Sequence, residues 1–257
     1  MIRISVLASS SRGNATVISG GGTHVLVDTG ISALRIRKGL AECGLSVPAL
    51  SGIFFTHEHQ DHVCGLGVLS KKDTLNLYCS RYMAQDVRGM APGAVFTYLE
   101  PGQTLEVGAL KITPFCVSHD ALDPLGYLFE CEGTRLGYVT DTGIIAKPMP
   151  ELLAGVQGLY LESNYDPDML ANSGRTPALI SRISGRWGHL SNEQACEFVR
   201  QIAHPGLQHL ILAHISPECN TPAKASRAMQ ATLSELGLST QLHCAAMANR
   251  LPWIEIQ

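Results

Sequence analysis

The run His-Glu-His-Gln-Asp-His at residues 57–62 constrains this chain more than any other feature, and it directly follows an apolar segment. Three histidines and two acids in six residues are costly to bury without a cation. In extended backbone, residues two apart point to the same side, so His57 and His59 are expected to bind one cation. We predict that Asp61 and His62 start a helix and approach from another direction, as two cations about 3.5 to 4 Å apart require.

Two other interpretations of this run are possible, and the sequence disfavours both. A polar turn with fortuitous histidines would leave the buried charges unpaired. A structural zinc site is usually closed and rich in cysteine, whereas only Cys64 lies close to the run. An open, catalytic metal site therefore fits better.

Composition places few further limits on the chain. The chain has 257 residues, of which 45% are hydrophobic and 16% charged, which is typical of a compact globular protein. We expect one domain over residues 1–257, because no low-complexity linker or repeat divides the chain. No apolar stretch approaches the ~20 residues of a membrane span, and the start lacks the apolar block of a signal peptide, so a cytoplasmic location is expected.

Charge and cysteines narrow the chemistry only slightly. The formal net charge of -3 gives no support for nucleic-acid binding, so a polyanionic substrate would need a local basic patch or bound cations. The eight cysteines are evenly spread without a C-x-x-C pair, which predicts buried free thiols.

Hydrophobic patterning predicts two β-rich halves with helices packed outside them, an α/β (α+β) fold in a four-layer αββα arrangement. Strands are expected at residues 2–8, 16–19, 25–27, 53–55, 75–79, 95–99, 110–117, 126–130, 136–140, 159–162, 207–213 and 241–244. Helices are expected at residues 31–43, 177–184, 192–203 and 222–236.

With its histidine-rich run after a strand, the sequence resembles the metallo-β-lactamase superfamily, and the rest of that family's pattern follows in order. Asp28 matches the aspartate that supports the metal-binding loop. The resemblance implies a first site of His57, His59 and His119. It implies a second site of Asp61, His62 and His214, with Asp141 as the carboxylate bridging both cations. Each residue alone has a bland explanation as a turn former or a solvated strand end, but the ordered set is far more specific.

Several motifs resemble one subgroup over almost the whole chain, the YycJ/WalJ-type metallohydrolases of bacteria. They are the segments 9–16, 56–59 with 65–69, 117–124, 162–166, 188–192, 213–216 and 220–222. The resemblance implies a metal-dependent nuclease, with 5′-to-3′ DNA exonuclease activity in some members. Within and beside these motifs, the residues expected to contact substrate are Ser11, Asn14, Asn164, Arg175, Arg182, Ser191 and Asn192. The chain lacks the family's tyrosine near residues 174–177, so substrate contacts there are expected to differ.

The segment Gly188-His189-Leu190-Ser191 also resembles the Gly-His motif of the β-CASP nucleases, whose histidine lies near the scissile phosphate. Phosphodiester cleavage expels an alkoxide, which an imidazole near neutral pKa can protonate, so His189 is the predicted general acid. The alternative is that His189 only packs at the start of the helix that Ser191 caps. Arg175, Arg182 and Arg186 bring positive charge, and Trp187 could stack on a base, although a solvated helix face explains them nearly as well.

The sequence therefore predicts metal-assisted hydrolysis of phosphodiesters in nucleic acid, most specifically of DNA from the 5′ end. Asp61 and Asp141 are expected to hold the attacking hydroxide, and the cations are expected to be two divalent ions, Zn or Mn, possibly Fe. The main rival is a small-molecule or cyclic-phosphate phosphodiesterase, which would need a closed pocket. A non-catalytic DNA-repair or cell-wall regulatory partner stays open, although the intact ligand set argues against it.

Two further rivals share the fold. A secreted β-lactamase would need a signal peptide. A flavin-dependent di-iron protein that reduces O2 or NO would need a flavin domain and carries glutamate where this chain has His59.

Overall fold

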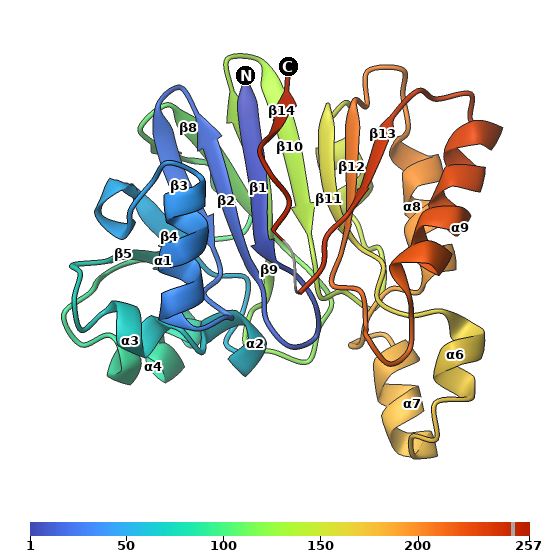
Figure 1. The fold of residues 1–257 in the computed structure, drawn as a ribbon, viewed down its shortest axis with the longest axis horizontal. Helices are drawn as coiled ribbons and strands as arrows, with labels where there is room; N and C mark the ends of the chain where they lie inside the picture. Colours follow the sequence, from blue (N-terminus) through green and yellow to red (C-terminus); the bar gives the residue numbers. More distant parts are fainter. Residues whose placement is uncertain (248–249) are drawn as a thin grey trace.

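Two seven-stranded sheets face each other in the computed structural model, which describes residues 1–247 and 250–257. Helices cover the outer face of each sheet, so the layers run helix, sheet, sheet, helix (Figure 1). The predicted four-layer α/β arrangement is confirmed. Among the described residues, no helix combines the length and apolar character needed to cross a membrane.

The first sheet has the strand order β14-β1-β2-β3-β4-β5-β6. The strands β3 to β6 run parallel to one another, and the others pair antiparallel. The bounds are β1 (Ile2–Ala8), β2 (Ala15–Gly20), β3 (Thr23–Val27), β4 (Gly52–Phe54), β5 (Asn76–Cys79), β6 (Val95–Tyr98) and β14 (Ile254–Ile256).

The second sheet has the order β13-β12-β11-β10-β9-β8-β7, in which β10 to β13 are parallel. The remaining strands pair antiparallel. The bounds are β7 (Leu105–Val107), β8 (Leu110–Cys116), β9 (Leu125–Cys131), β10 (Thr134–Val139), β11 (Gly158–Glu162), β12 (His209–Ala213) and β13 (Gln241–Cys244).

Helices α1, α3 and α4 pack on the first sheet, and α5, α8 and α9 pack on the second. Figure 1 shows α1 beside the first sheet and α8 and α9 beside the second. Helices α2, α6 and α7 lie along the lower edge in that view. The bounds are α1 (Ala33–Glu42), α2 (Gln60–Val63), α3 (Leu66–Leu69), α4 (Arg81–Val87), α5 (Met149–Leu153), α6 (Pro167–Ala171), α7 (Pro177–Ser184), α8 (Asn192–Ile202) and α9 (Pro222–Glu235). Single 3-10 turns span Val47–Ala49 and Arg88–Met90.

The central core lies between the sheets and takes apolar side chains from both. Tyr138 and Tyr160 stack there with ring centroids 4.1 Å apart, and Phe54 packs edge-on against Tyr127. Separate apolar cores fill the space between each sheet and its helices. Because both faces of each sheet are buried, clusters of polar side chains lie at the ends of the strands and not on the faces of the sheets.

All the predicted strands and helices are present, with ends shifted by one or two residues. The sequence interpretation missed only short elements, among them β7, β14 and α3 to α6. The missed helices have four to seven residues, at most two turns, which is too little helical periodicity to read locally, so these helices depend on tertiary packing.

All eight cysteines are free, but the prediction of buried thiols is confirmed for only four of them. Cys43 and Cys244 are half-buried, and Cys64 and Cys116 are exposed. Cys64 directly follows α2, and Cys116 is the last residue of β8. Both elements end near the polar cluster, where the apolar core stops. The four histidines outside the motifs, His24, His204, His209 and His243, are half-buried.

Candidate metal centre and its surroundings

The site lies where the parallel strands of both sheets end. Asp28 follows β3, Asp141 follows β10 and His214 follows β12, and these residues have φ values of 61°, 51° and 50°. A left-handed backbone is costly for residues other than glycine and persists where the surrounding structure enforces it, often at functional sites. The turns bring these three side chains into one cluster.

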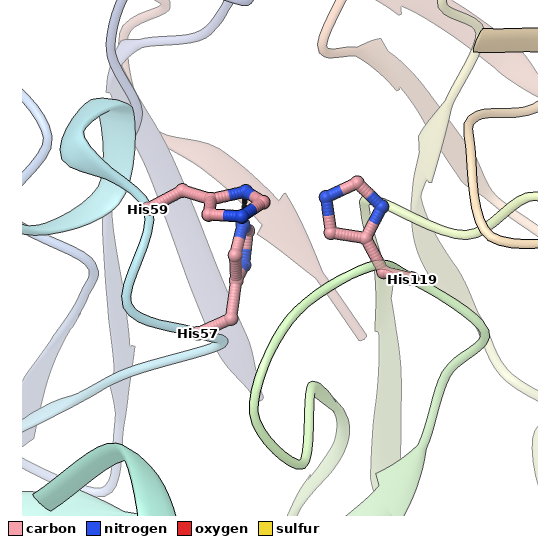
Figure 2. A group of neighbouring side chains, drawn as sticks. All are labelled: His57, His59 and His119. Carbon is pink, nitrogen blue, oxygen red and sulfur yellow. Dashed lines mark hydrogen bonds between the residues drawn. The ribbon is translucent and has the colours of Figure 1, made fainter. Parts of the chain in front are cut away.

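Three histidines form the first group of the cluster. His57 and His59 come from the loop after β4, and His119 comes from the loop after β8; Figure 2 shows their rings pointing toward one another. One ring nitrogen of each lies within 4.8 Å of the other two. His57 Nε2 and His59 Nδ1 are 3.1 Å apart, which fits the expected same-side placement two residues apart.

A second group combines Asp61 and His62 of α2 with His214, again with ligand atoms within 4.8 Å of one another. Asp141 lies between the two groups. Its carboxylate oxygens are 3.4 Å from His62 Nε2, 3.4 Å from His214 Nε2 and 3.9 Å from His119 Nε2. The structure thus brings all seven predicted ligands together, with Asp141 able to face both groups.

The charges of this cluster fit divalent cations. Burial lowers the pKa of His57, and His62 lowers it further, to well below its ordinary value, so His57 is uncharged at neutral pH and could bind a cation. Burial alone would also lower the pKa of His214, but Asp141 and Asp61 outweigh it and raise the pKa to about 10. The carboxylates that stabilise a proton on this buried imidazole would also stabilise a metal cation bound in place of the proton.

The carboxylates respond in the matching way. Burial would raise the pKa of Asp141, yet His214 and His62 hold it well below its ordinary value. The pKa of Asp61 is likewise lowered by His62 and His214 against the effect of burial. Both carboxylates are therefore ionised at neutral pH, and a donor set of imidazoles and carboxylates suits Zn, Mn or Fe.

Asp28 supports the cluster without belonging to either group. Its carboxylate accepts hydrogen bonds from the Thr56 backbone N–H and hydroxyl, both at 2.9 Å, and lies 2.8 Å from His62 Nδ1. This contact fixes the ring so that Nε2 faces Asp61 and Asp141. Asn14 adds a contact from its amide to His62 Nε2 at 3.1 Å and bonds the backbone carbonyl of Asp61.

Glu162 contacts the cluster, although the sequence interpretation left it without a role. It ends β11, is fully buried, and its Oε1 lies 2.7 Å from His189 Nδ1 and 3.0 Å from His214 Nδ1. Its Oε2 accepts the backbone N–H groups of Thr142 and Leu190. Burial alone would raise the pKa of Glu162, but His189 and His214 lower it below its ordinary value. The available signal was a carboxylate at the end of a predicted strand, inside the motif at residues 162–166.

His189 lies beside the metal cluster. Its ring stacks on His214 with centroids 5.2 Å apart and is 5.0 Å from the ring of His119. With Nδ1 bonded to Glu162 and the side chain 19% exposed, the ring is oriented yet open to a substrate. This arrangement suits a proton donor better than a packing residue.

Comparisons with known proteins agree with this geometry. Residues 23–215 match the family described as "Beta-lactamase superfamily domain". The chain belongs to the metallo-β-lactamase superfamily.

Its relatives within the superfamily include exodeoxyribonuclease YycJ of Bacillus anthracis, 32% identical over 92% of this chain and 90% of the relative. Exodeoxyribonuclease WalJ of Streptococcus pneumoniae is also 32% identical, with the same coverage. The predicted YycJ/WalJ subgroup is therefore confirmed. Among solved structures, the metallo-β-lactamase fold protein YhfI of Bacillus subtilis has a TM-score of 0.75 at 14% identity, covering 98% of this chain and 99% of its own. That likeness shows the fold.

The residues expected to contact substrate in this superfamily member fall into two sets. Ser11, Arg175 and Arg182 have exposed or partly exposed side chains, although Arg175 pairs with Glu218 and Arg182 pairs with Asp120. The other four are buried and bonded within the fold, namely Asn14, Asn164, Ser191 and Asn192.

The buried residues of this set stabilise the loops around the metal cluster from the interior of the protein. Asn164 Nδ2 donates to the His214 carbonyl at 2.8 Å and lies 3.0 Å from His214 Nδ1. Ser191 caps α8 through a reciprocal capping box with Gln194. Asn192 accepts hydrogen bonds from Ser163 and Asn220. These contacts stabilise the loops that carry His189 and His214.

Proposed function

We propose that this chain is a metal-dependent phosphodiester hydrolase acting on nucleic acid, specifically an exonuclease that degrades DNA from the 5′ end. The observation that carries the proposal is the pair of three-residue ligand groups around Asp141, with His189 held beside them by Glu162. The exodeoxyribonuclease names of the YycJ and WalJ relatives support DNA as the substrate.

In this proposal two divalent cations, Zn or Mn, are held at the cluster. His57, His59 and His119 would bind one, Asp61, His62 and His214 the other, and Asp141 would contact both. Such cations lower the pKa of water and neutralise charge on phosphate oxygens. Asp28 and Glu162 hold the His62 and His214 rings so that their Nε2 atoms face this position.

His189 is the proposed general acid. Its Nδ1 bonds to Glu162, so its Nε2 is the atom that would carry a proton to the departing alkoxide. The Glu162 carboxylate keeps the His189 ring in one orientation through this contact. Asp61, one-quarter exposed, and Asp141, which is buried, are the carboxylates placed to position the attacking water.

The substrate path is proposed to run over the exposed residues beside the cluster. Ser11 and the Arg175 and Arg182 side chains flank the site, and the ion pairs with Glu218 and Asp120 would be exchanged for phosphate on binding.

The eight free cysteines suit a reducing compartment, which supports a cytoplasmic location.

The test is a digestion with added Mn²⁺ or Zn²⁺ of DNA and RNA labelled at either end, beside a chromogenic phosphodiester. We expect labelled mononucleotide to be released first from the 5′ end of DNA. His57→Ala and Asp141→Ala should abolish cleavage, while His243→Gln, a histidine outside the cluster, should not. Cleavage of the chromogenic ester alone would favour the small-molecule phosphodiesterase. No cleavage of any substrate with either metal would refute the proposal.

A further inference from the structure

Trp187 is an exposed tryptophan beside the catalytic cluster. Its side chain is 54% exposed, whereas the chain's other tryptophan, Trp253, is half-buried and lies under the Arg3 guanidinium. Trp187 stands two residues before His189, on the loop that joins α7 to α8. Exposing an indole costs hydration free energy that burial would recover, so its placement at the site calls for an explanation.

The loop that carries Trp187 is held firmly against the metal-ligand loop. The Trp187 carbonyl accepts a hydrogen bond from Asp120 N at 3.0 Å, and the Arg186 carbonyl accepts one from Ser118 Oγ at 2.9 Å. His119 Nδ1 lies 3.0 Å from the next carbonyl, that of Gly188. The backbone that carries the indole is thus bonded to Ser118 and Asp120, the neighbours of His119. Because this backbone is already ordered, the loop would lose little conformational entropy when the indole stacks on a base.

The packing beneath this loop is equally tight. Gly143 lies so close that an added Cβ would be 2.3 Å from the Gly185 carbonyl oxygen and 2.4 Å from that of Arg186. Gly143 also donates its N–H to the Ser118 carbonyl at 2.8 Å. The loop therefore has little freedom to fold Trp187 inward.

The charge next to the indole is available for a phosphate. The Arg186 guanidinium lies over one face of the Trp187 ring, 5.4 Å from its centroid, and forms no ion pair in the described part of the chain. The neighbouring Arg175 and Arg182 are both paired with carboxylates. An exposed indole with an unpaired guanidinium next to it combines stacking with positive charge, as proteins that bind single-stranded nucleic acid do, and the proposed base would stack on the opposite face of the ring.

We propose that Trp187 stacks on the nucleobase next to the scissile phosphate, so that the enzyme acts on nucleotides that are unpaired at the strand end. The inference rests on the proposed nuclease function and names its substrate form. Paired bases already stack on their neighbours, whereas an unpaired base presents a free face to the indole. One stacked base contributes a factor of about 5 to 150 in affinity.

Tryptophan fluorescence of the metal-free protein, in which cleavage is prevented, measures this contact directly. A short single-stranded oligonucleotide should quench the emission, and the same strand with abasic sugars at its 5′ end should not. Trp187→Phe should remove the quenching signal, while the matched control Trp253→Phe should retain it. Equal quenching by the abasic strand, or full quenching in Trp187→Phe, would overturn the inference.

Cleavage kinetics give a second, independent readout. Trp187→Ala should raise KM for single-stranded DNA by about 5- to 150-fold with a smaller change in kcat, and Trp187→Tyr should recover most of the loss. An unchanged KM in Trp187→Ala, with normal wild-type cleavage, overturns the stacking inference alone. If the wild-type protein cleaves nothing, the proposed function fails, and the fluorescence titration still decides whether Trp187 binds a base.

Discussion

Replacing Glu162 by glutamine tests the link between the second metal group and the proposed general acid. The carboxylate is fully buried and faces four donor positions, two imidazole Nδ1 atoms and two backbone N–H groups. Glutamine keeps the shape but has one acceptor oxygen and a donating amide. Because the two backbone N–H groups cannot change, the amide NH2 must turn toward the imidazoles of His189 and His214.

The magnitude follows from those two contacts. A hydrogen bond to a charged group contributes about 1.5–3 kcal/mol, and loss of a positioned general acid lowers the rate by about 10²- to 10⁴-fold. Removing the partner that orients a metal-binding histidine lowers metal affinity by about 10- to 100-fold. We therefore expect Glu162→Gln to lose about 10²- to 10⁴-fold in kcat on DNA at saturating metal, and to need more metal to saturate.

Leaving-group dependence separates the two effects. A nitrophenyl phosphodiester expels a stabilised anion that needs no proton, so at saturating metal Glu162→Gln should retain far more activity on it than on DNA. The double variant Glu162→Gln with His189→Ala should be no slower on DNA than His189→Ala, because both changes remove one function. Glu193→Gln, an exposed glutamate in the first turn of α8, is the matched control.

Two results would refute the reasoning. Equal losses on both substrates at saturating metal would mean that Glu162 does not act through proton donation. Additive losses in the double variant would mean that Glu162 and His189 act separately. The thermal unfolding temperature of each variant is the control: an unchanged value shows that the loss of activity does not come from unfolding.

Further predictions concern metal binding and packing. In the metal-free protein, the raised pKa of His214 gives stability that is fully present below its ordinary pKa of 6.5 and is lost as pH rises through about 10. A bound cation must displace that proton, so calorimetry in two buffers of different ionisation enthalpy should show proton release and an affinity that rises with pH; no proton release would contradict the assignment. Gly30→Ala would place a Cβ 1.6 Å from the Asp61 carbonyl oxygen, so urea unfolding should show a loss of about 1–3 kcal/mol or more. Gly89→Ala, which meets nothing within 4 Å, is its control, and equal effects in the two variants would refute the packing argument.

The sequence determined the layers of the fold and the order of the ligands. Long strands such as β1 and β8 and amphipathic helices such as α8 carry enough periodicity to be read locally. Residues 57–62 predict a metal site because they combine histidine and aspartate, and because histidines two residues apart after a strand can bind the same cation. The prediction of a single domain over residues 1–257 stays a prediction.

Only the tertiary structure decided which residues stand behind the ligands. Glu162 and His189 are 27 residues apart and meet because β11 ends beside the loop before α8. No local pattern specifies that contact, since it depends on strand order in the second sheet. The same holds for Asn192, which the sequence suggested as a substrate contact and which the fold uses in a buried hydrogen-bond network.

Exposure at the site edge was also decided in three dimensions. The sequence predicted a buried thiol at Cys64 and left Trp187 either as a base-stacking residue or as part of a solvated face, because a sequence does not show where the core ends. At the ends of the parallel strands the loops turn outward to place ligands, so the apolar layers stop there. The sequence by itself thus predicted the histidine-rich run as a metal site, whereas only folding determined which side chains surround it.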